Sequence, residues 1–136
     1  MSINKHNNYL FVTGRRKNAT CSILYSFNSD KFLTTTINNK KFEEYFSKER
    51  CQLKALLPCK VTNTSLPNMR VKIIGGGEMA QASAMSHAIS QLLKALNDEY
   101  TKILKPLKLL TRDDRRVERK KIGQPGARKK HPTNKR

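Results

Sequence analysis

Acidic residues are scarce in this sequence, which has 10 Asp and Glu against 28 Lys and Arg in 136 residues and a net charge of +18. Such an excess of positive charge repels itself in a compact chain unless a polyanion is present. Long apolar runs are also missing, since none approaches the roughly 20 residues of a membrane span. We therefore expect a nucleic acid as the partner, and no membrane.

Groups that could perform chemistry are few. The three cysteines, Cys21, Cys51 and Cys59, are odd in number and lack a C-x-x-C pairing, so neither a disulfide framework nor a zinc site is indicated. The histidines are scattered, and no paired carboxylates lie in a region patterned like a cleft. We predict no catalytic residue, no metal and no cofactor. The first twelve residues lack a signal-peptide core and an Arg-rich presequence, which predicts a chain that works where it is synthesised.

One glycine-rich stretch, residues 75–77, follows a predicted strand and precedes a predicted helix. Free backbone N–H groups at a helix start attract anions, so a phosphate-transferring enzyme is one alternative. The stretch has no GxxxxGK[ST] pattern, and Glu78 would bring negative charge to the place of a phosphate. A tight turn from strand to helix is the interpretation we favour.

The order of predicted elements indicates an α+β fold. Strands are expected at residues 9–13 and 19–27, on either side of a basic interruption "GRRKN", and in the β-branched stretch 32–37. An Asn-Asn turn at residues 38–39 precedes a short helix, and residues 51–57 form another, closed by Pro58. Residues 69–73 alternate as a half-buried strand, residues 79–96 repeat as an amphipathic helix, and residues 99–110 are helical up to Pro106. These elements predict a small sheet with helices packed on one face.

The sequence changes character after Leu110. Thr111 and Asp114 match a helix capping pattern, so a basic helix is expected there, and Gly123 and Pro125 would end it. Residues 111–136 hold 11 Lys and Arg and 3 acids, and there is no acid after Glu118. We predict a globular body over residues 1–110, and a basic helix followed by an extended arm over residues 111–136.

Basic segments at both ends of the chain indicate RNA binding. Arginine-rich elements that become ordered on binding are typical of RNA partners, because the guanidinium group holds phosphates and stacks on bases. Aromatic residues are few, with no Trp, which disfavours a reader of single strands by base stacking. Two alternatives remain at this point: a solvated, disordered arm, and a free nucleic-acid-binding or chaperone-like protein without a defined site.

Several motifs resemble the small-subunit ribosomal protein nine family in its bacterial and organellar form. "TGRRKNAT" (13–20) resembles the family's opening signature, and "INNKKFEEYF" (37–46) resembles its "EYF" motif. "VKIIGGGEMAQASAMSHAISQLL" (71–93) is similar to its glycine-rich passage from strand to helix. The most specific match is "LLTRDDRRVERKKIG" (109–123), which is followed by "GAR" and a terminal "KR". The resemblance therefore runs almost from end to end.

The resemblance implies a fold of the ribosomal protein S5 domain 2-like type and a structural role in the head of the small ribosomal subunit. Implied partners are small-subunit ribosomal RNA, peptidyl-site transfer RNA and neighbouring head proteins. Transfer RNA would be contacted by Lys135 and Arg136. Ribosomal RNA would be bound by Arg15, Arg16, Lys17, Arg112, Arg115, Arg116, Arg119, Lys120, Lys121, Arg128, Lys129 and Lys130.

Three places depart from the family pattern. Asn39 stands where the turn glycine is usual, and it still tolerates positive φ. Ala80 stands where a glycine is usual before Gln81, and the end reads "PTNKR" in place of an aromatic-Ser-Lys-Arg ending. "GQPGARKK" (123–130) resembles mitochondrial members more than plastid ones, so the sequence favours a mitochondrial ribosome, with a plastid or the bacterial cytoplasm as alternatives.

Overall fold

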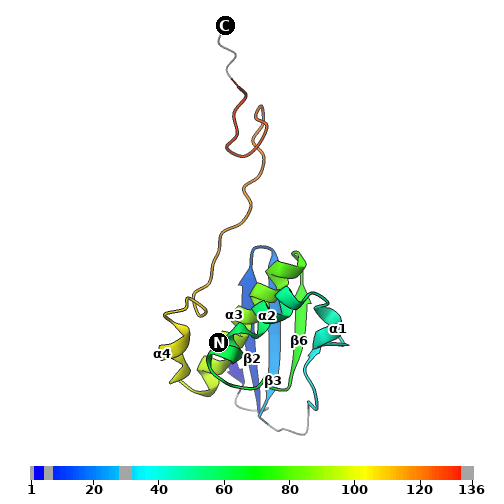
Figure 1. Ribbon diagram of the computed structural model, residues 1–136, viewed down its shortest axis with the longest axis vertical. Coiled ribbons are helices and arrows are strands. Elements are labelled where there is room, and N and C mark those ends of the chain that lie inside the picture. The colour runs from blue at the N-terminus through cyan, green and yellow to red at the C-terminus, as the bar shows by residue number, and fades with distance from the viewer. Residues whose placement is uncertain (1, 5–7, 28–31, 133–136) are drawn as a thin grey trace.

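A six-stranded mixed sheet forms one layer of the protein. The computed structural model describes residues 2–4, 8–27 and 32–132 (Figure 1). The strands follow the spatial order β1-β2-β3-β6-β4-β5, and neighbours are antiparallel except for the parallel pair β4 and β6. Their bounds are β1 Ser2–Asn4, β2 Tyr9–Arg16, β3 Ala19–Ser26, β4 Thr36–Ile37, β5 Lys40–Lys41 and β6 Met69–Ile74.

Helices cover one face of this sheet, as the sequence predicts. The long helix α3 (Glu78–Leu96) packs on β2 and β3, and α2 (Glu49–Val61) packs on α3. Two short helices complete the set, α1 (Phe42–Tyr45) at one edge and α4 (Tyr100–Leu104) beside α3 (Figure 1). No helix in the described ranges is long and apolar enough to cross a membrane. The α+β class expected from the element order is therefore confirmed.

The core lies between the sheet and α3. On β6 the side chains of Met69, Val71 and Ile73 are buried while those between them are exposed, which is the period of two that the sequence predicts. Ile89 of α3 is fully buried against this face, as are its neighbours on the same stripe. Burying a side chain of this size contributes about 1.5 to 3 kcal/mol, so the stripe determines which face of α3 meets the sheet.

Strand β2 runs through the basic motif, contrary to the predicted interruption. Gly14, Arg15 and Arg16 pair with β3, and only Lys17 and Asn18 form the turn. Gly14 faces α3, where an added Cβ would lie 2.2 Å from the carbonyl oxygen of Ala84 and 2.5 Å from the backbone nitrogen of Ala88. The glycine lets strand and helix backbones touch. Gly14 of the motif therefore packs against α3, while Arg15 and Arg16 supply positive charge.

The Asn-Asn turn has the expected geometry. Asn38 and Asn39 have φ of 48° and 67°, and α1 follows them directly. The Asn38 amide donates to the Ile73 carbonyl (2.9 Å), and its oxygen accepts from the Ile73 N–H (3.0 Å). Asn38 thus extends the β4–β6 pairing by one position. The β-branched stretch before it forms strand only at Thr36 and Ile37.

The boundaries of two predicted helices are wrong. Pro58 lies inside α2, which continues to Val61, because a proline removes only one hydrogen bond so close to a helix end. The Thr62 hydroxyl donates to the Pro58 carbonyl (2.9 Å) and helps to end the helix instead. The second helical stretch is shorter than expected, since α4 ends at Leu104 and turns follow.

The basic helix predicted from Thr111 is also wrong. Residues 112–121 contain no regular secondary structure, and the chain runs away from the body as an extended arm (Figure 1). Its two apolar side chains, Val117 and Ile122, are 86% and 96% exposed, so no hydrophobic face holds a helix together. An isolated helix of about ten residues is marginal in water, and the capping pattern alone does not offset that.

Candidate nucleic-acid interface

Residues 108–117 connect the body to the arm, and we call this segment the arm root. The Leu110 carbonyl accepts two hydrogen bonds from α3, from His87 Nε2 (3.3 Å) and Gln91 Nε2 (3.1 Å). His87 and Gln91 are four residues apart, so they lie on the same side of the helix. Because Leu110 also packs on the core, the end of the body is anchored where the arm begins.

An ion pair fixes the arm root a second time. Arg16 Nη1 at the end of β2 lies 2.6 Å from Asp113 Oδ1, across 97 residues of sequence. Arg115 donates to the same carboxylate, with Nη2 2.7 Å from Oδ2, and its backbone N–H also donates to Oδ1 (3.1 Å). These Arg115 hydrogen bonds, with Arg16 beside them, hold the pKa of Asp113 far below its usual range. Asp113 is therefore ionised at neutral pH and keeps the two arginines in place.

The two basic segments predicted to bind RNA come together at the end of the β2–β3 hairpin. Lys17 occupies the turn with φ of 51°. A cavity of about 240 Å³ beside it is lined by Lys17 and Gly76 from the body and by Arg116 and Val117 from the arm root. Residues far apart in sequence thus form one basic surface, which the sequence predicts as two separate segments.

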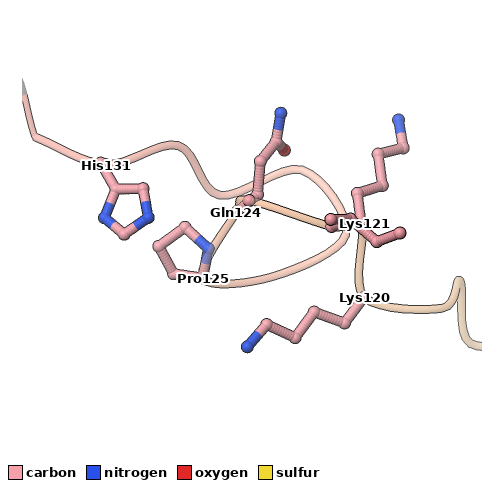
Figure 2. A pocket seen from close by; sticks show the side chains of 7 residues that line it. Lys120, Lys121, Gln124, Pro125 and His131 are labelled. Atoms are coloured by element: carbon pink, nitrogen blue, oxygen red, sulfur yellow. The ribbon is translucent and has the colours of Figure 1, made fainter.

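Farther along, the arm forms a closed loop. Arg128 binds the Glu118 carboxylate with both nitrogens of its fork, at 2.6 Å from Nη2 and 3.1 Å from Nε, and this contact lowers the pKa of Glu118. Gly123, with φ of 73°, turns the chain inside the loop. Figure 2 shows the Pro125 and His131 rings beside the hollow of the loop.

The loop presents its cations outward. Lys120 and Lys121 extend in different directions from neighbouring positions (Figure 2), and both belong to the lining of a cavity of about 440 Å³. The Glu118–Arg128 pair joins the ends of the loop, so its shape does not depend on a hydrophobic core. The arm is therefore shaped in part before any partner binds.

The remaining predicted RNA-binding residues lie on the surface. Arg16 is half-buried, and the other predicted residues in the described ranges are exposed: Arg15, Lys17, Arg112, Arg115, Arg116, Arg119, Lys120, Lys121, Arg128, Lys129 and Lys130. Lys135 and Arg136, predicted to contact transfer RNA, lie outside the described residues. The structure thus places the cations on a hairpin end and along an arm, where phosphates have access to them.

The triple glycine at residues 75–77 allows the tight turn between β6 and α3. Gly75 and Gly76 have φ of 73° and 70°, and a Cβ on Gly76 would lie 2.9 Å from the Cβ of Ala19. Glu78, the first residue of α3, pairs with Lys48 across 2.5 Å. These contacts favour the turn interpretation over a nucleotide cradle. Within the described ranges, no group of three or more His, Cys, Asp or Glu side chains could hold a metal ion.

Sequence reasoning missed the residues that anchor the arm root. It counted His87 only among the scattered histidines, and it gave Gln91 no role. Burial lowers the pKa of His87, the hydrogen bond to Leu110 opposes this, and Arg112 adds to the lowering. The available signal was the spacing of four between His87 and Gln91, but it does not reveal what the two side chains bind.

Comparisons with known proteins identify the family of the chain. The family described as Ribosomal protein S9/S16 matches residues 14–136. A small ribosomal subunit protein uS9 of Maridesulfovibrio salexigens is 42% identical over 128 residues, which cover 93% of this chain and 95% of that protein. The protein of that name from Anaeromyxobacter sp. (strain K) is 40% identical over 126 residues (92% and 95%), and that from Flavobacterium psychrophilum is 39% identical over 124 residues (90% and 94%).

Proposed function

Because the chain belongs to the Ribosomal protein S9/S16 family, we propose that it is a structural constituent of the small ribosomal subunit. Membership confirms the resemblance carried by the "GRRK" and "LTRDDRRVERKK" motifs, and it identifies a structural protein and not an enzyme. The proposed role has two parts. The protein binds ribosomal RNA in the head, and its C-terminal tail extends to the peptidyl-site transfer RNA.

One observation carries the RNA-binding part. The chain is fastened to the body at Leu110 and Asp113 and then leaves it as an arm with exposed cations and no core of its own. Such an arm gains little from folding on itself, because it buries almost no apolar surface. A polyanion that neutralises the arm supplies the free energy that is needed to order it, and in a ribosomal subunit the polyanion is RNA.

The compartment remains a prediction. The relatives named above are bacterial proteins. We place the chain in a ribosome, and we keep the mitochondrial ribosome as the proposal that the "GQPGARKK" motif favours over a plastid one. Fractionation of the source cells, with this chain followed by mass spectrometry in purified organellar and cytoplasmic ribosomes, distinguishes the three locations.

Sedimentation tests the ribosomal role. We expect the full chain to co-sediment with small subunits in moderate salt, because the arm is held among phosphates. The triple variant Arg116→Gln, Arg119→Gln, Lys120→Gln should lose much of this resistance to salt. The matched control replaces three body lysines, Lys94→Gln, Lys102→Gln and Lys105→Gln, and should sediment like the wild type. A wild-type chain found only in light fractions, or bound with a steep salt slope to any RNA, would point to a free RNA-binding protein instead.

Deleting Lys135 and Arg136 tests the transfer RNA contact. Assembly should continue, while retention of transfer RNA at the peptidyl site should weaken by about 1 to 3 kcal/mol, the scale of one or two charge-assisted hydrogen bonds. Filter binding of transfer RNA to reconstituted subunits measures this change. The control is Lys129→Gln with Lys130→Gln, which removes the same charge from residues assigned to ribosomal RNA. Retention equal to that of the wild type would eliminate the contact.

A further inference from the structure

A second basic cavity lies between the body and the arm root, and we call it the root cavity. It has a volume of about 250 Å³, and β2, α2, α3 and the arm root all contribute to its lining. Four of its lining side chains are cationic and one is acidic: Arg15, Arg16, Lys54, Lys108 and Asp113. Since liquid water occupies about 30 Å³ per molecule, the cavity has room for a tetrahedral oxyanion with several waters.

Most of this positive charge is not neutralised by the protein. Asp113 is already shared by Arg16 and Arg115. Arg15, Lys54 and Lys108 form no ion pair within the part of the chain that the structure describes. Lys54 is half-buried and lines the cavity without an ion-pair partner among the described residues. Like charges held together in this way favour an added anion.

Two buried polar atoms at the same place also lack partners. Ser86 is one of the residues that line the root cavity, it is 3% exposed, and its hydroxyl has no hydrogen-bond partner among the described residues. The same holds for Nδ1 of His87, whose Nε2 is engaged by the Leu110 carbonyl. A buried polar atom without a partner is costly, so such atoms in a folded protein call for an explanation.

We propose that the root cavity binds a phosphate group, held by Lys54, Lys108 and Arg15 and by a hydrogen bond from Ser86. In an assembled ribosome the phosphate belongs to the RNA backbone, and in this form the inference rests on the proposed function. Free inorganic phosphate offers the same chemistry. Because the cavity is lined by β2, α2, α3 and the arm root, the bound anion also joins the start of the arm to the body.

His87 supplies a spectroscopic readout of the bound anion. The Leu110 carbonyl can only accept, so neutral His87 carries its proton on Nε2 and Nδ1 is left as an acceptor. The other charged residues that line the cavity with His87 are Arg15 and Arg16 on β2, Lys54 on α2, and Lys108 and Asp113 on the arm root, and Arg112 also acts on the charge of the ring. An anion in the cavity favours the imidazolium form, in which Nδ1–H is a donor. Phosphate binding should therefore raise the pKa of His87, which burial otherwise lowers.

The first experiment uses inorganic phosphate as the probe. The full chain is titrated with sodium phosphate against a chloride background of equal ionic strength, and the ring signals of His87 are followed by NMR. We expect saturable shifts and a higher His87 pKa. Ser86→Ala should weaken phosphate binding roughly tenfold or more, because it removes a charge-assisted hydrogen bond. The same change should leave the thermal midpoint equal or higher, since the hydroxyl has no partner within the described part of the chain.

The second experiment uses small-subunit ribosomal RNA as the probe. Lys54→Gln should reduce affinity and lower the salt slope of binding by about 1, as expected for one lost phosphate contact. The matched control is Lys60→Gln on the same helix, an exposed lysine that does not line the cavity, and it should leave the slope unchanged. If phosphate binds at the cavity and Lys54→Gln also weakens RNA binding, the RNA backbone is the source of the phosphate. A change with inorganic phosphate alone identifies the free anion.

Two outcomes separate the proposals. If chloride and phosphate shift the His87 signals equally, or if Lys60→Gln lowers the salt slope of RNA binding as much as Lys54→Gln does, the root cavity is not a phosphate site. If wild-type protein binds phosphate there but fails to bind ribosomal RNA, the cavity stands and the proposed ribosomal function falls.

Discussion

Replacing Gly14 with alanine should destabilise the protein more than the same replacement at any other glycine whose φ is not positive. The new Cβ would lie 2.2 Å from the Ala84 carbonyl oxygen and 2.8 Å from the Ala88 Cβ. Carbon and oxygen approach to about 3.3 Å at the closest in ordinary contacts, so α3 must move away from β2 by about 1 Å. Both obstacles belong to the helix, and neither can rotate away.

The expected magnitude follows from two opposing effects. Overpacking a well-packed contact costs about 1 to 3 kcal/mol, and here the upper end applies because a backbone oxygen is in the way. Replacing a glycine reduces the entropy of the unfolded chain, which returns up to about 1 kcal/mol. The net loss is about 2 to 3 kcal/mol. For a chain of this size that corresponds to a thermal midpoint lower by roughly 10 °C.

Urea and thermal unfolding followed by circular dichroism measure this loss. The control is Gly126→Ala in the arm, where the Cβ would make an ordinary contact at 3.4 Å with the Lys129 Cβ. It should change the stability by less than about 0.5 kcal/mol. Gly14→Ala should also increase proteolysis of the arm root, because Arg16 moves with β2. An unfolding midpoint equal to that of the wild type would refute the close contact of strand and helix.

Three further predictions concern the arm root and the core. The pKa of the Asp113 carboxyl is lowered in the folded state, so its contribution to stability is complete above the unfolded value of about 3.9 and is lost as pH falls through the folded value. The arm root should therefore keep its folded NMR signals down to about pH 4 and lose them only in stronger acid, whereas Asp113→Asn should lose them already at pH 7. Gln91→Ala removes one of two hydrogen bonds to the Leu110 carbonyl and should cost about 1 kcal/mol in urea unfolding; no loss would mean that His87 alone holds the carbonyl. Burial raises the pKa of the Cys21 thiol to about 12, so iodoacetamide at pH 8 should alkylate Cys21 only in unfolded protein, and rapid labelling of native protein would contradict its burial.

Much of the body could be predicted because its signals are local. The alternation of Met69, Val71 and Ile73 and the helical repeat of residues 79–96 each specify a buried face, and the structure has both. Asn38 and Asn39 specify a turn through their tolerance of positive φ. A pattern of this kind is read from neighbours in sequence, so it needs no knowledge of the rest of the fold.

The predictions that failed depended on what lies opposite a residue. Thr111 and Asp114 form a valid capping pattern, but Val117 and Ile122 meet no apolar surface, so no helix forms. Pro58 was expected to end a helix, and packing of the buried residues beside it lets the helix continue. Gly14 was assigned to a basic interruption, although its small size is required by a helix 70 residues later.

The amino-acid sequence alone determined the class of fold, the family and the basic arm, and it led to the prediction of a nucleic-acid partner, because charge, periodicity and motifs are properties of the chain itself. The tertiary structure decided how the arm is attached. His87 and Arg16 lie far apart in sequence, and only the packing of α3 on β2 brings both to the arm root, at Leu110 and Asp113. The same packing forms the root cavity and leaves the hydroxyl of Ser86, one of its lining residues, without a hydrogen-bond partner among the residues that the structure describes. Long-range contacts of this kind depend on the whole core, which no local pattern encodes.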